Sequence, residues 1–213
     1  GIRSGWGNIT GESNTSLGSY SYMDATPGSH TNCTMIGTYS DCSSSSSANN
    51  STALGYGSKI TASDQVRVGD ASVTSIGGYA GWTTLTKKGS AKSINEDIVG
   101  LEFIKKLRPV SYKLDVELIN KGLGIEENPE DSNIKGSISR SENLKRSGFL
   151  AEEVEKAAEE SGYDFSGLDK PGNKDDQYGI RYSEFVVPLI KAVQEQQDTI
   201  EKLEKRIEEL EGK

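Results

Sequence analysis

The sequence predicts an α+β chain in three consecutive parts: a β-structured region of short repeats, a small α+β region, and one long terminal helix. Three observations lead to this prediction. Apolar residues recur at heptad spacing near the end of the chain, an aliphatic residue followed by glycine recurs near its start, and charged residues are divided unequally between the two. We place the three parts at residues 1–85, 86–185 and 186–213.

The first part is almost uncharged. Residues 1–85 carry eight charged side chains, whereas residues 86–213 carry the other 48. Ser, Thr and Gly dominate the first part, and its large aliphatic residues are too few to form a core of the usual kind. Composition alone therefore leaves a flexible Ser-rich linker open, above all at residues 42–51, where we expect a surface loop.

An irregular repeat favours folded β-structure over a linker. An aliphatic residue followed by glycine recurs at intervals of 19, 18, 14 and 8 residues. Such repeats are typical of a β-solenoid, a stack of β-coils in which each coil buries its inward apolar side chain only against its neighbours. Copies from several chains would bury these side chains better. The predicted core of this shaft consists of Leu17, Ile36, Leu54, Val68 and Ile76.

The middle part has the patterns of an ordinary globular α+β region. Apolar residues from Ile94 to Leu107 follow helical spacing, and Pro109 ends this helix because the residue before proline avoids the α conformation. The other predicted elements are a strand at 110–114, a long loop or hairpin at 120–146, a helix at 151–160 and a polar loop at 166–177.

The terminal helix carries a narrow apolar stripe. Its spacing alternates three and four residues, so the apolar side chains share one face while Glu and Lys cover the rest. Self-association explains the stripe, and a lone helix packed on its own domain is the alternative. Gln196 interrupts the stripe and would fix register or oligomer number, while Pro188 implies a later helix start or a kink. The predicted interface is Val186, Leu189, Val193, Gln196, Ile200, Leu203, Ile207 and Leu210.

Three ordered blocks of sequence carry a resemblance to a known family. They are Gly100-Leu-x-Phe-Ile-x-x-Leu107-Arg-Pro109-Val-x-Tyr112, Gly148-Phe-Leu-Ala-Glu-Glu-Val154, and Tyr182-Ser-Glu-Phe-Val-Val-Pro-Leu-Ile-Lys-Ala-Val-Gln-Glu-Gln196. Over residues 86–213, these blocks and the heptads resemble the C-terminal intramolecular chaperone domain of the endosialidase type, found in phage tail spikes and tail fibres. The stretch Ser51-Thr-Ala-Leu-Gly-Tyr-Gly-Ser58 is similar to head repeats of trimeric autotransporter adhesins and phage fibres.

The resemblance implies a homotrimer, which the heptads alone do not select. In that family the domain brings three chains together and sets the register of the β-shaft that precedes it. Such a device is useful because pairing between separate chains has a high closure entropy, and a trimeriser makes the pairing effectively intramolecular. The implied location is a virion tail fibre, or an extracellular fibre or injection apparatus. A weaker alternative function is a receptor-binding tip, in which the loop at 120–146 recognises a receptor on the host cell surface.

Many members of that family cut themselves at the N-terminal edge of the domain, using a serine and a lysine. The family pattern is Ser-Asp-x-x-x-Lys followed closely by an aliphatic residue, and the lysine acts as the base for the serine hydroxyl. If Ile94 is the aliphatic residue, Thr86 takes the nucleophile position. If Ile98 takes that role, Ser90 is the nucleophile.

The lysine of this pattern is missing in both alignments, because Ala91 or Asn95 stands in its place. Lys92 is the nearest substitute, but the geometry of such a pair tolerates little displacement. We therefore expect a chaperone domain that stays attached. The alternative is an active self-cleaving serine peptidase that cuts near residues 85–90.

The remaining residues indicate little further chemistry. His30 is the only histidine, which excludes a multi-histidine metal site or a His-based triad within one chain, and we expect it at the surface. Cys33 and Cys42 form either a disulfide or, by default, two free thiols. We expect no metal and no cofactor. The net charge of −8 argues against nucleic-acid binding, and the chain lacks an apolar run of membrane-spanning length.

Overall fold

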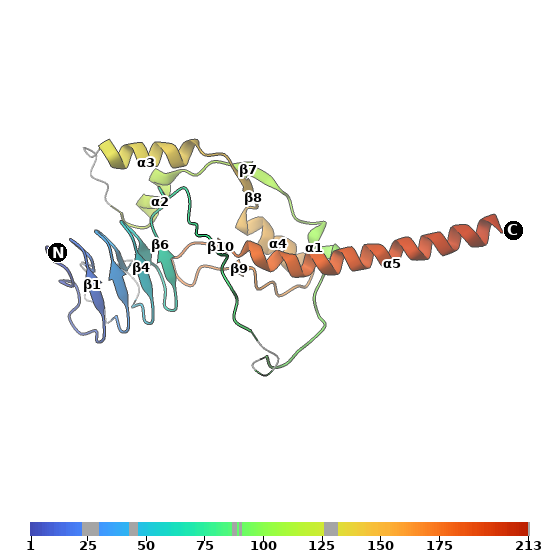
Figure 1. The fold of residues 1–213 in the computed structure, drawn as a ribbon, viewed down its shortest axis with the longest axis horizontal. Helices are drawn as coiled ribbons and strands as arrows, with labels where there is room; N and C mark the ends of the chain where they lie inside the picture. The colour runs from blue at the N-terminus through green and yellow to red at the C-terminus, as the bar shows by residue number, and fades with distance from the viewer. Residues whose placement is uncertain (23–29, 43–46, 87–88, 90, 126–131, 213) are drawn as a thin grey trace. The chain divides into compact units, whose positions relative to one another are not determined.

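The computed structural model describes residues 1–22, 30–42, 47–86, 89, 91–125 and 132–212 (Figure 1). A parallel four-stranded sheet lies in the N-terminal part, and a small α+β region ends in a long helix, so the predicted mixed fold is confirmed in outline. The chain divides into two compact units. The first comprises Gly1–Ile76, Tyr112–Arg146 and Pro171–Gln177, and the second comprises Gly77–Ser111, Ser147–Lys170 and Tyr178–Lys213.

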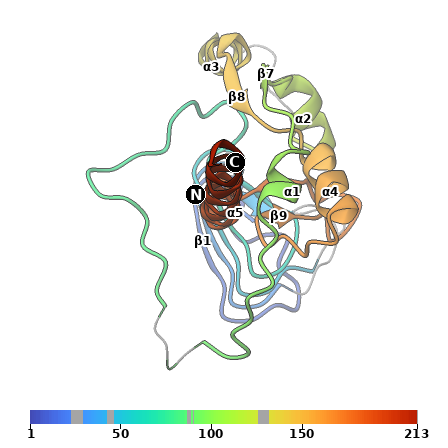
Figure 2. The same ribbon diagram turned by 90° about the vertical axis from the view of Figure 1, so that its right-hand side faces the viewer.

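The repeats of the first unit form a stack of coils, and each coil contributes one short strand to a parallel sheet. The sheet has the order β1 (Thr15–Leu17), β2 (Thr34–Ile36), β4 (Thr52–Leu54) and β6 (Val66–Val68). Its register carries no shift, since Leu17 pairs with Ile36, Ile36 with Leu54 and Leu54 with Val68. Strands β3 (Asp41–Cys42) and β5 (Lys59–Ile60) pair in parallel elsewhere in the coils. Figure 2 shows the coils one behind another, so the described repeats are folded rather than a linker.

Two positions hold a left-handed backbone in all four coils, and a third, at Tyr20, Tyr39 and Gly57, does so in three of them. Of the first two, one is the glycine after the strand, and a methyl group at Gly37 would lie 2.5 Å from the carbonyl oxygen of Gly55 in the next coil. The other lies two residues before the strand and is a short polar residue, which tolerates this conformation. The first set is Gly18, Gly37, Gly55 and Gly69, with φ of 139°, 130°, 108° and 74°, and the second is Ser13, Asn32, Asn50 and Asp64, with φ of 58°, 59°, 53° and 61°.

The interior of the coils holds small and polar side chains together with a few large ones, Tyr22, Met35 and Ile60. Met35 and Ala53 have no exposed surface. The buried Ser21 hydroxyl donates to the carbonyl oxygen of Met35 at 3.0 Å, and the buried Ser40 hydroxyl donates to that of Gly37 at 2.8 Å. Because these hydroxyls have partners, the coils close with few large aliphatic residues inside. The apolar cluster consists of Tyr22, Cys33, Met35, Cys42, Ala48, Ala53 and Ile60.

His30 belongs to this interior, so the prediction of a surface histidine is wrong. The residue is 1% exposed, and its ring centroid lies 5.4 Å from that of Tyr22. Its Nδ1 accepts a hydrogen bond from the backbone N–H of Ala48 at 2.9 Å. In the neutral ring this bond places the proton on Nε2. The ring thus has a backbone partner from the neighbouring coil at Nδ1, while Nε2 is buried with no hydrogen-bonding partner among the described residues.

Cys33 and Cys42 are buried free thiols. The Cys33 thiol donates to the carbonyl oxygen of Ala48 at 3.3 Å, and burial raises its pKa. Both residues serve as small core side chains. Of the predicted surface loop at 42–51, residues 43–46 lie outside the described residues, while Ala48 and Ser51 are buried.

The second unit packs around a cluster of aromatic rings. Phe103 is fully buried, with its ring centroid 4.9 Å from that of Phe165 and 6.3 Å from that of Phe185. Partly buried Leu168 and Ile180 pack against this cluster. The cluster residues come from α1 (Leu101–Ile104), α4 (Ala151–Glu160), the antiparallel pair β9 (Leu168–Asp169) and β10 (Gly179–Ile180), the 3₁₀ turn η2 (Tyr182–Phe185) and the segments adjoining them. Helix α5 (Val186–Glu211) follows η2 directly.

The helix predicted from Ile94 is shorter in the structure. Helix α1 begins at Leu101, whose backbone N–H donates to the Glu195 carboxylate of α5 at 2.7 Å. Ile94 is 70% exposed and lies outside the helix. A side chain from a distant part of the sequence therefore fixes this helix start, and the local apolar spacing does not show it.

The segment predicted as a loop at 120–146 contains the last three residues of one helix and the whole of another, so that prediction is wrong. Helix α2 (Val116–Gly122) is capped by Asp115, whose carboxylate accepts from the Leu118 N–H at 2.8 Å. Helix α3 (Ser132–Asn143) follows. The predicted helix at 151–160 is confirmed, and the predicted strand is present as β7 (Val110–Tyr112), which pairs with β8 (Arg146–Gly148).

The start of helix α5 shows how Pro188 is accommodated in the helix. The helix begins at Val186 after the 3₁₀ turn, so the proline lies in the first helical turn. The backbone N–H groups of a first turn have no partner within the helix, and the missing N–H of proline therefore costs no hydrogen bond there.

Candidate functional site

The sheet β1-β2-β4-β6 has one face that the described residues leave exposed or half-exposed. Side chains alternate along a strand, and the middle residues of the strands, such as Met35 and Ala53, point into the coil. The residues on either side of them point outward. Leu17, Leu54 and Val68 are 61%, 43% and 41% exposed. We call this set the outer face, and its members are Thr15, Leu17, Thr34, Ile36, Thr52, Leu54, Val66 and Val68.

The structure thus places most of the predicted shaft core on the outer face, not in the interior of one chain. The reason is the side-chain period of two, because a shift of one residue exchanges the inner and outer faces of a strand. Ile76 lies beyond β6, the last strand of this sheet, and is 62% exposed. That these aliphatic residues form a core between chains stays a prediction.

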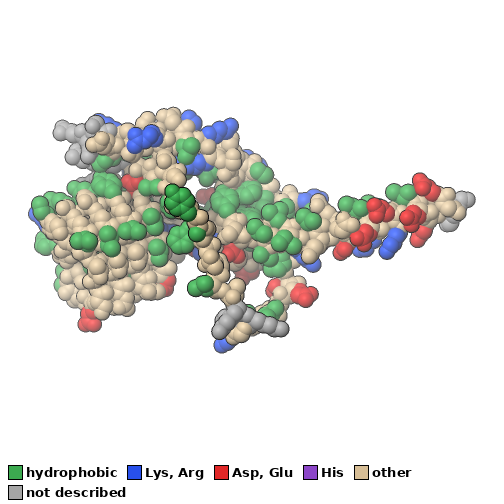
Figure 3. Space-filling view, viewed as in Figure 1, with side chains coloured by type: hydrophobic (Ala, Val, Ile, Leu, Met, Phe, Trp, Pro, Cys, Tyr) green, Lys and Arg blue, Asp and Glu red, His purple; other side chains and the backbone are tan. Residues whose placement is uncertain are grey.

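Sequence reasoning missed half of the outer face. Thr15, Thr34, Thr52 and Val66 form a second column, in register along the sheet. Each stands two residues before the aliphatic residue of its coil, and this spacing alone could have found them. The outer face therefore combines a Thr-rich column with an aliphatic column, and Figure 3 shows apolar side chains gathered over the strands.

Helix α5 presents the second regular apolar surface, in the other unit. All seven apolar residues of the predicted stripe are between 45% and 62% exposed, and Gln196 is exposed as well. A different side of the helix packs on its own unit, through Phe185, Pro188 and Ala192. The alternative of a helix whose stripe packs on its own domain therefore does not describe this chain. Figure 3 shows apolar side chains along α5 among charged ones.

The outer half of α5 has no support from its own chain. Every residue from 196 to 211 is exposed. Isolated helices of this length are marginal in water, and most helical stability in proteins comes from packing of an apolar face. Burying one Leu or Ile side chain contributes about 1.5–3 kcal/mol. The stripe from Ile200 to Leu210 therefore represents a large stabilisation that only another molecule can supply.

Of the candidate catalytic residues the structure describes Thr86 and Lys92, and no hydrogen bond joins these two. Thr86 and Lys92 are exposed and lie outside helices and strands, and neither has a hydrogen-bonding partner among the described residues. Ser90 lies outside the described residues. The serine–lysine chemistry thus stays a sequence-based alternative.

The clearest electrostatic interactions join parts of one unit. In the second unit, a hydrogen bond from Lys170, aided by one from Tyr178, lowers the pKa of Glu155, and the same contact raises the pKa of Lys170. In the first unit, burial raises the pKa of Asp176, but hydrogen bonds led by that from Thr61 outweigh burial and leave the pKa below its usual value. Both carboxylates are held ionised, which suits structural contacts rather than proton transfer.

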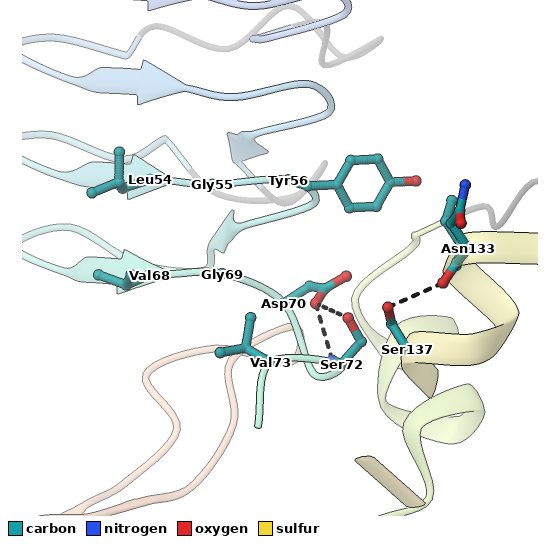
Figure 4. Close-up of a pocket in the computed structure, with 11 residues that line it drawn as sticks. Leu54, Gly55, Tyr56, Val68, Gly69, Asp70, Ser72, Val73, Asn133 and Ser137 are labelled. Carbon is teal, nitrogen blue, oxygen red and sulfur yellow. Dashed lines mark hydrogen bonds between the residues drawn. The ribbon is translucent and has the colours of Figure 1, made fainter. Parts of the chain in front are cut away.

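A hollow of about 480 Å³ lies in the first unit between the last coils and α3. Leu54 and Val68 of the outer face and Val73 contribute apolar walls (Figure 4). Asp70 is engaged internally, since its carboxylate accepts from the Ser72 N–H at 3.0 Å and from the Ser72 hydroxyl at 2.7 Å. The hollow continues the apolar character of the outer face and offers space for apolar side chains.

Searches for other kinds of site gave no candidate in the part of the chain that the structure describes. No cluster of three His, Cys, Asp or Glu side chains is placed to hold a metal ion. No described helix combines the length and apolar character needed to cross a membrane. Comparison with protein-family models, with curated proteins and with solved structures found no match to the chain.

Proposed function

We propose that this chain is the C-terminal part of a homotrimeric fibre of the phage tail-fibre or adhesin type, exposed outside the cell. Residues 86–213 act as an intramolecular chaperone: they join three chains and set the register of the β-coils. The domain stays attached after assembly. The number three rests on the sequence resemblance.

One observation carries the proposal: each unit presents a regular apolar surface that its own chain does not cover. The outer face of the coils and the stripe of α5 both repeat at fixed intervals. Exposed apolar surfaces of this kind mark association sites. A second copy of the same chain has matching periods for both surfaces, because coils repeat along a sheet and heptads repeat along a helix.

The two surfaces differ in how strongly they specify the register between chains, which favours a separate role for each. The heptads of α5 are local and find register through side-chain packing along one helix. The outer face is flat and nearly repetitive, and such surfaces specify register weakly. Joining the helices first raises the effective concentration of the coils and limits their slippage.

The test of this proposal is the replacement Leu54→Asp. If the outer face is buried between chains, the carboxylate becomes an unpaired buried charge and should destabilise the associated coils by at least about 3 kcal/mol. Near-ultraviolet circular dichroism during urea unfolding reports on the coils, because tyrosine rings of successive coils contact one another. The ring centroid of Tyr39 lies 5.3 Å from that of Tyr20 and 5.9 Å from that of Tyr56. The unmodified protein should also gain stability with its own concentration.

The matched control is Ser47→Asp, which adds the same charge at an exposed position outside the sheet. It should unfold like the unmodified protein. Equal urea midpoints for Leu54→Asp and Ser47→Asp would contradict burial of the outer face between chains.

A further inference from the structure

The last coil of the repeats is covered by residues from far along the chain. The first unit contains the coils, Gly1–Ile76, together with Tyr112–Arg146 and Pro171–Gln177. Its described residues thus lie on both sides of residues 85–90, where the sequence resemblance implies a self-cleavage site. Hydrogen bonds and an ion pair hold these segments together.

The loop Pro171–Gln177 reaches the last two coils through Asp176. The Asp176 side chain is 8% exposed, and its carboxylate accepts hydrogen bonds from the Thr61 hydroxyl at 2.5 Å and from the Gln65 amide at 3.3 Å. The Arg67 guanidinium lies 3.7 Å from the same oxygen. Asn173 adds a bond from its amide to the carbonyl oxygen of Thr61 at 2.7 Å. A largely buried carboxylate with these partners is a specific contact.

The loop is also held by hydrogen bonds within itself. The Asn173 side-chain oxygen accepts from the backbone N–H groups of Asp175 and Asp176 at 2.9 and 3.1 Å. The Gly172 N–H donates to the second carboxylate oxygen of Asp176 at 3.1 Å. A preformed loop loses less conformational entropy on docking, which strengthens the contact.

A second contact comes from α3. The Ser141 hydroxyl donates to the carbonyl oxygen of Ala71 at 2.9 Å, and Ser141 has no exposed surface. Arg146 donates to the hydroxyl and carbonyl oxygens of Ser141 at 3.0 and 2.9 Å and fixes its orientation. Segments Tyr112–Arg146 and Pro171–Gln177 therefore both bind residues 61–71 of the coils.

The peptide connection between the coils and these segments is exposed. Residues 77–86 and 91–97 are all exposed and contain no helix or strand. Extended chain of this kind is where proteases cut most readily. The candidate positions Thr86 and Lys92 lie within it.

We propose that residues 61–71 form a docking surface for segments 112–146 and 171–177 that holds when the peptide connection is broken. A chain cut between residues 77 and 98, by itself or by an external protease, then stays together as a nicked protein. The recognised partner is a preformed polypeptide loop that presents a buried carboxylate to Thr61, Gln65 and Arg67. This inference goes beyond the proposed function and applies equally to a single chain and to a trimer.

The experiment replaces residues 79–85, one for one, with the recognition sequence of a site-specific protease. The full-length folded protein is cut and passed over a size-exclusion column, first in native buffer and then in urea. Both fragments should leave the column in one peak in native buffer and in separate peaks in urea. Separate elution in native buffer would overturn the proposal.

Variants of the loop show whether this contact holds the fragments. In the cut protein, Asp176→Ala should speed fragment separation about 10- to 100-fold, as expected for a lost hydrogen-bonded charge. Lys174→Ala, at an exposed position of the same loop, should leave the rate unchanged. The rate is followed by fluorescence anisotropy of a dye on Gly1 after dilution. Equal rates for the two variants would contradict the assignment of Asp176.

Circular dichroism before cutting shows whether Asp176→Ala folds. If it does not, the near-isosteric Thr61→Val and the variant Asp176→Asn replace it in a double-mutant cycle. The effects of these two changes on the separation rate should be strongly non-additive. Additive effects would overturn a direct contact between Thr61 and Asp176 as the basis of docking.

Discussion

Replacing Ile200 and Ile207 by aspartate should reduce the mass of the protein in solution from that of three chains to that of one. Both side chains lie on the exposed stripe of α5, 48% and 52% exposed in the single chain. In a coiled coil each would be buried, so each change removes about 1.5–3 kcal/mol of apolar burial and adds an unpaired charge at the helix contact. Sedimentation equilibrium measures the change directly.

The matched control for this double variant changes the net charge by the same amount on the outside of the helix. Gln194→Asp with Lys205→Gln does so at heptad positions that face away from the stripe. This control should keep the mass of the unmodified protein. If the double aspartate variant also keeps that mass, α5 does not join the chains.

Replacing Gly37 by alanine should unfold the coils or destabilise them by at least about 3 kcal/mol. The glycine has φ of 130°, a backbone region that side chains other than glycine rarely adopt. A methyl group there would also lie 2.5 Å from the carbonyl oxygen of Gly55, which is backbone and cannot turn aside. Urea unfolding followed by near-ultraviolet circular dichroism gives the change in free energy.

Gly77→Ala is the control for this second variant, because it changes the glycine of the last sequence repeat. A methyl group at Gly77 would have no atom within 4 Å. Its stability should stay within about 0.5 kcal/mol of the unmodified protein, as for most exposed positions. A similarly small effect of Gly37→Ala would show that the glycine column is not what closes the coils.

The coil repeats could be predicted from the sequence because the turn after each strand needs a positive φ, which glycine adopts readily. An aliphatic residue followed by glycine marks a strand and the turn after it at four of the five copies. Which face is inside could not be predicted in this way. The interior takes in Ser21, Ala53 and His30 alongside Met35 and Ile60, while Leu17 and Leu54 lie on the outer face.

The errors in the second half of the chain come from tertiary contacts. Helix α1 starts at Leu101 because Glu195, 94 residues away, accepts its N–H. Helix α3 has a polar sequence that includes Gly136, so its local pattern resembled a loop, yet Ser141 is fully buried and binds Ala71 of the coils. Such contacts over long sequence separations leave little trace in local periodicity.

The stripe of α5 shows the opposite case. Its heptads were readable because they need no knowledge of the rest of the chain, and the structure places all seven apolar residues on an exposed helix surface. The contacts of the loop Pro171–Gln177 could not be predicted from the sequence in this way. Its Asp and Asn residues follow no repeating spacing, and only the fold reveals that Asp176 binds Thr61.

The central claim is that this chain works as a self-assembled trimer. Sedimentation equilibrium of the unmodified protein across a range of concentrations tests it most directly. We expect a single species with the mass of three chains of 23.0 kDa each. A mass of one or two chains at every concentration would contradict the account.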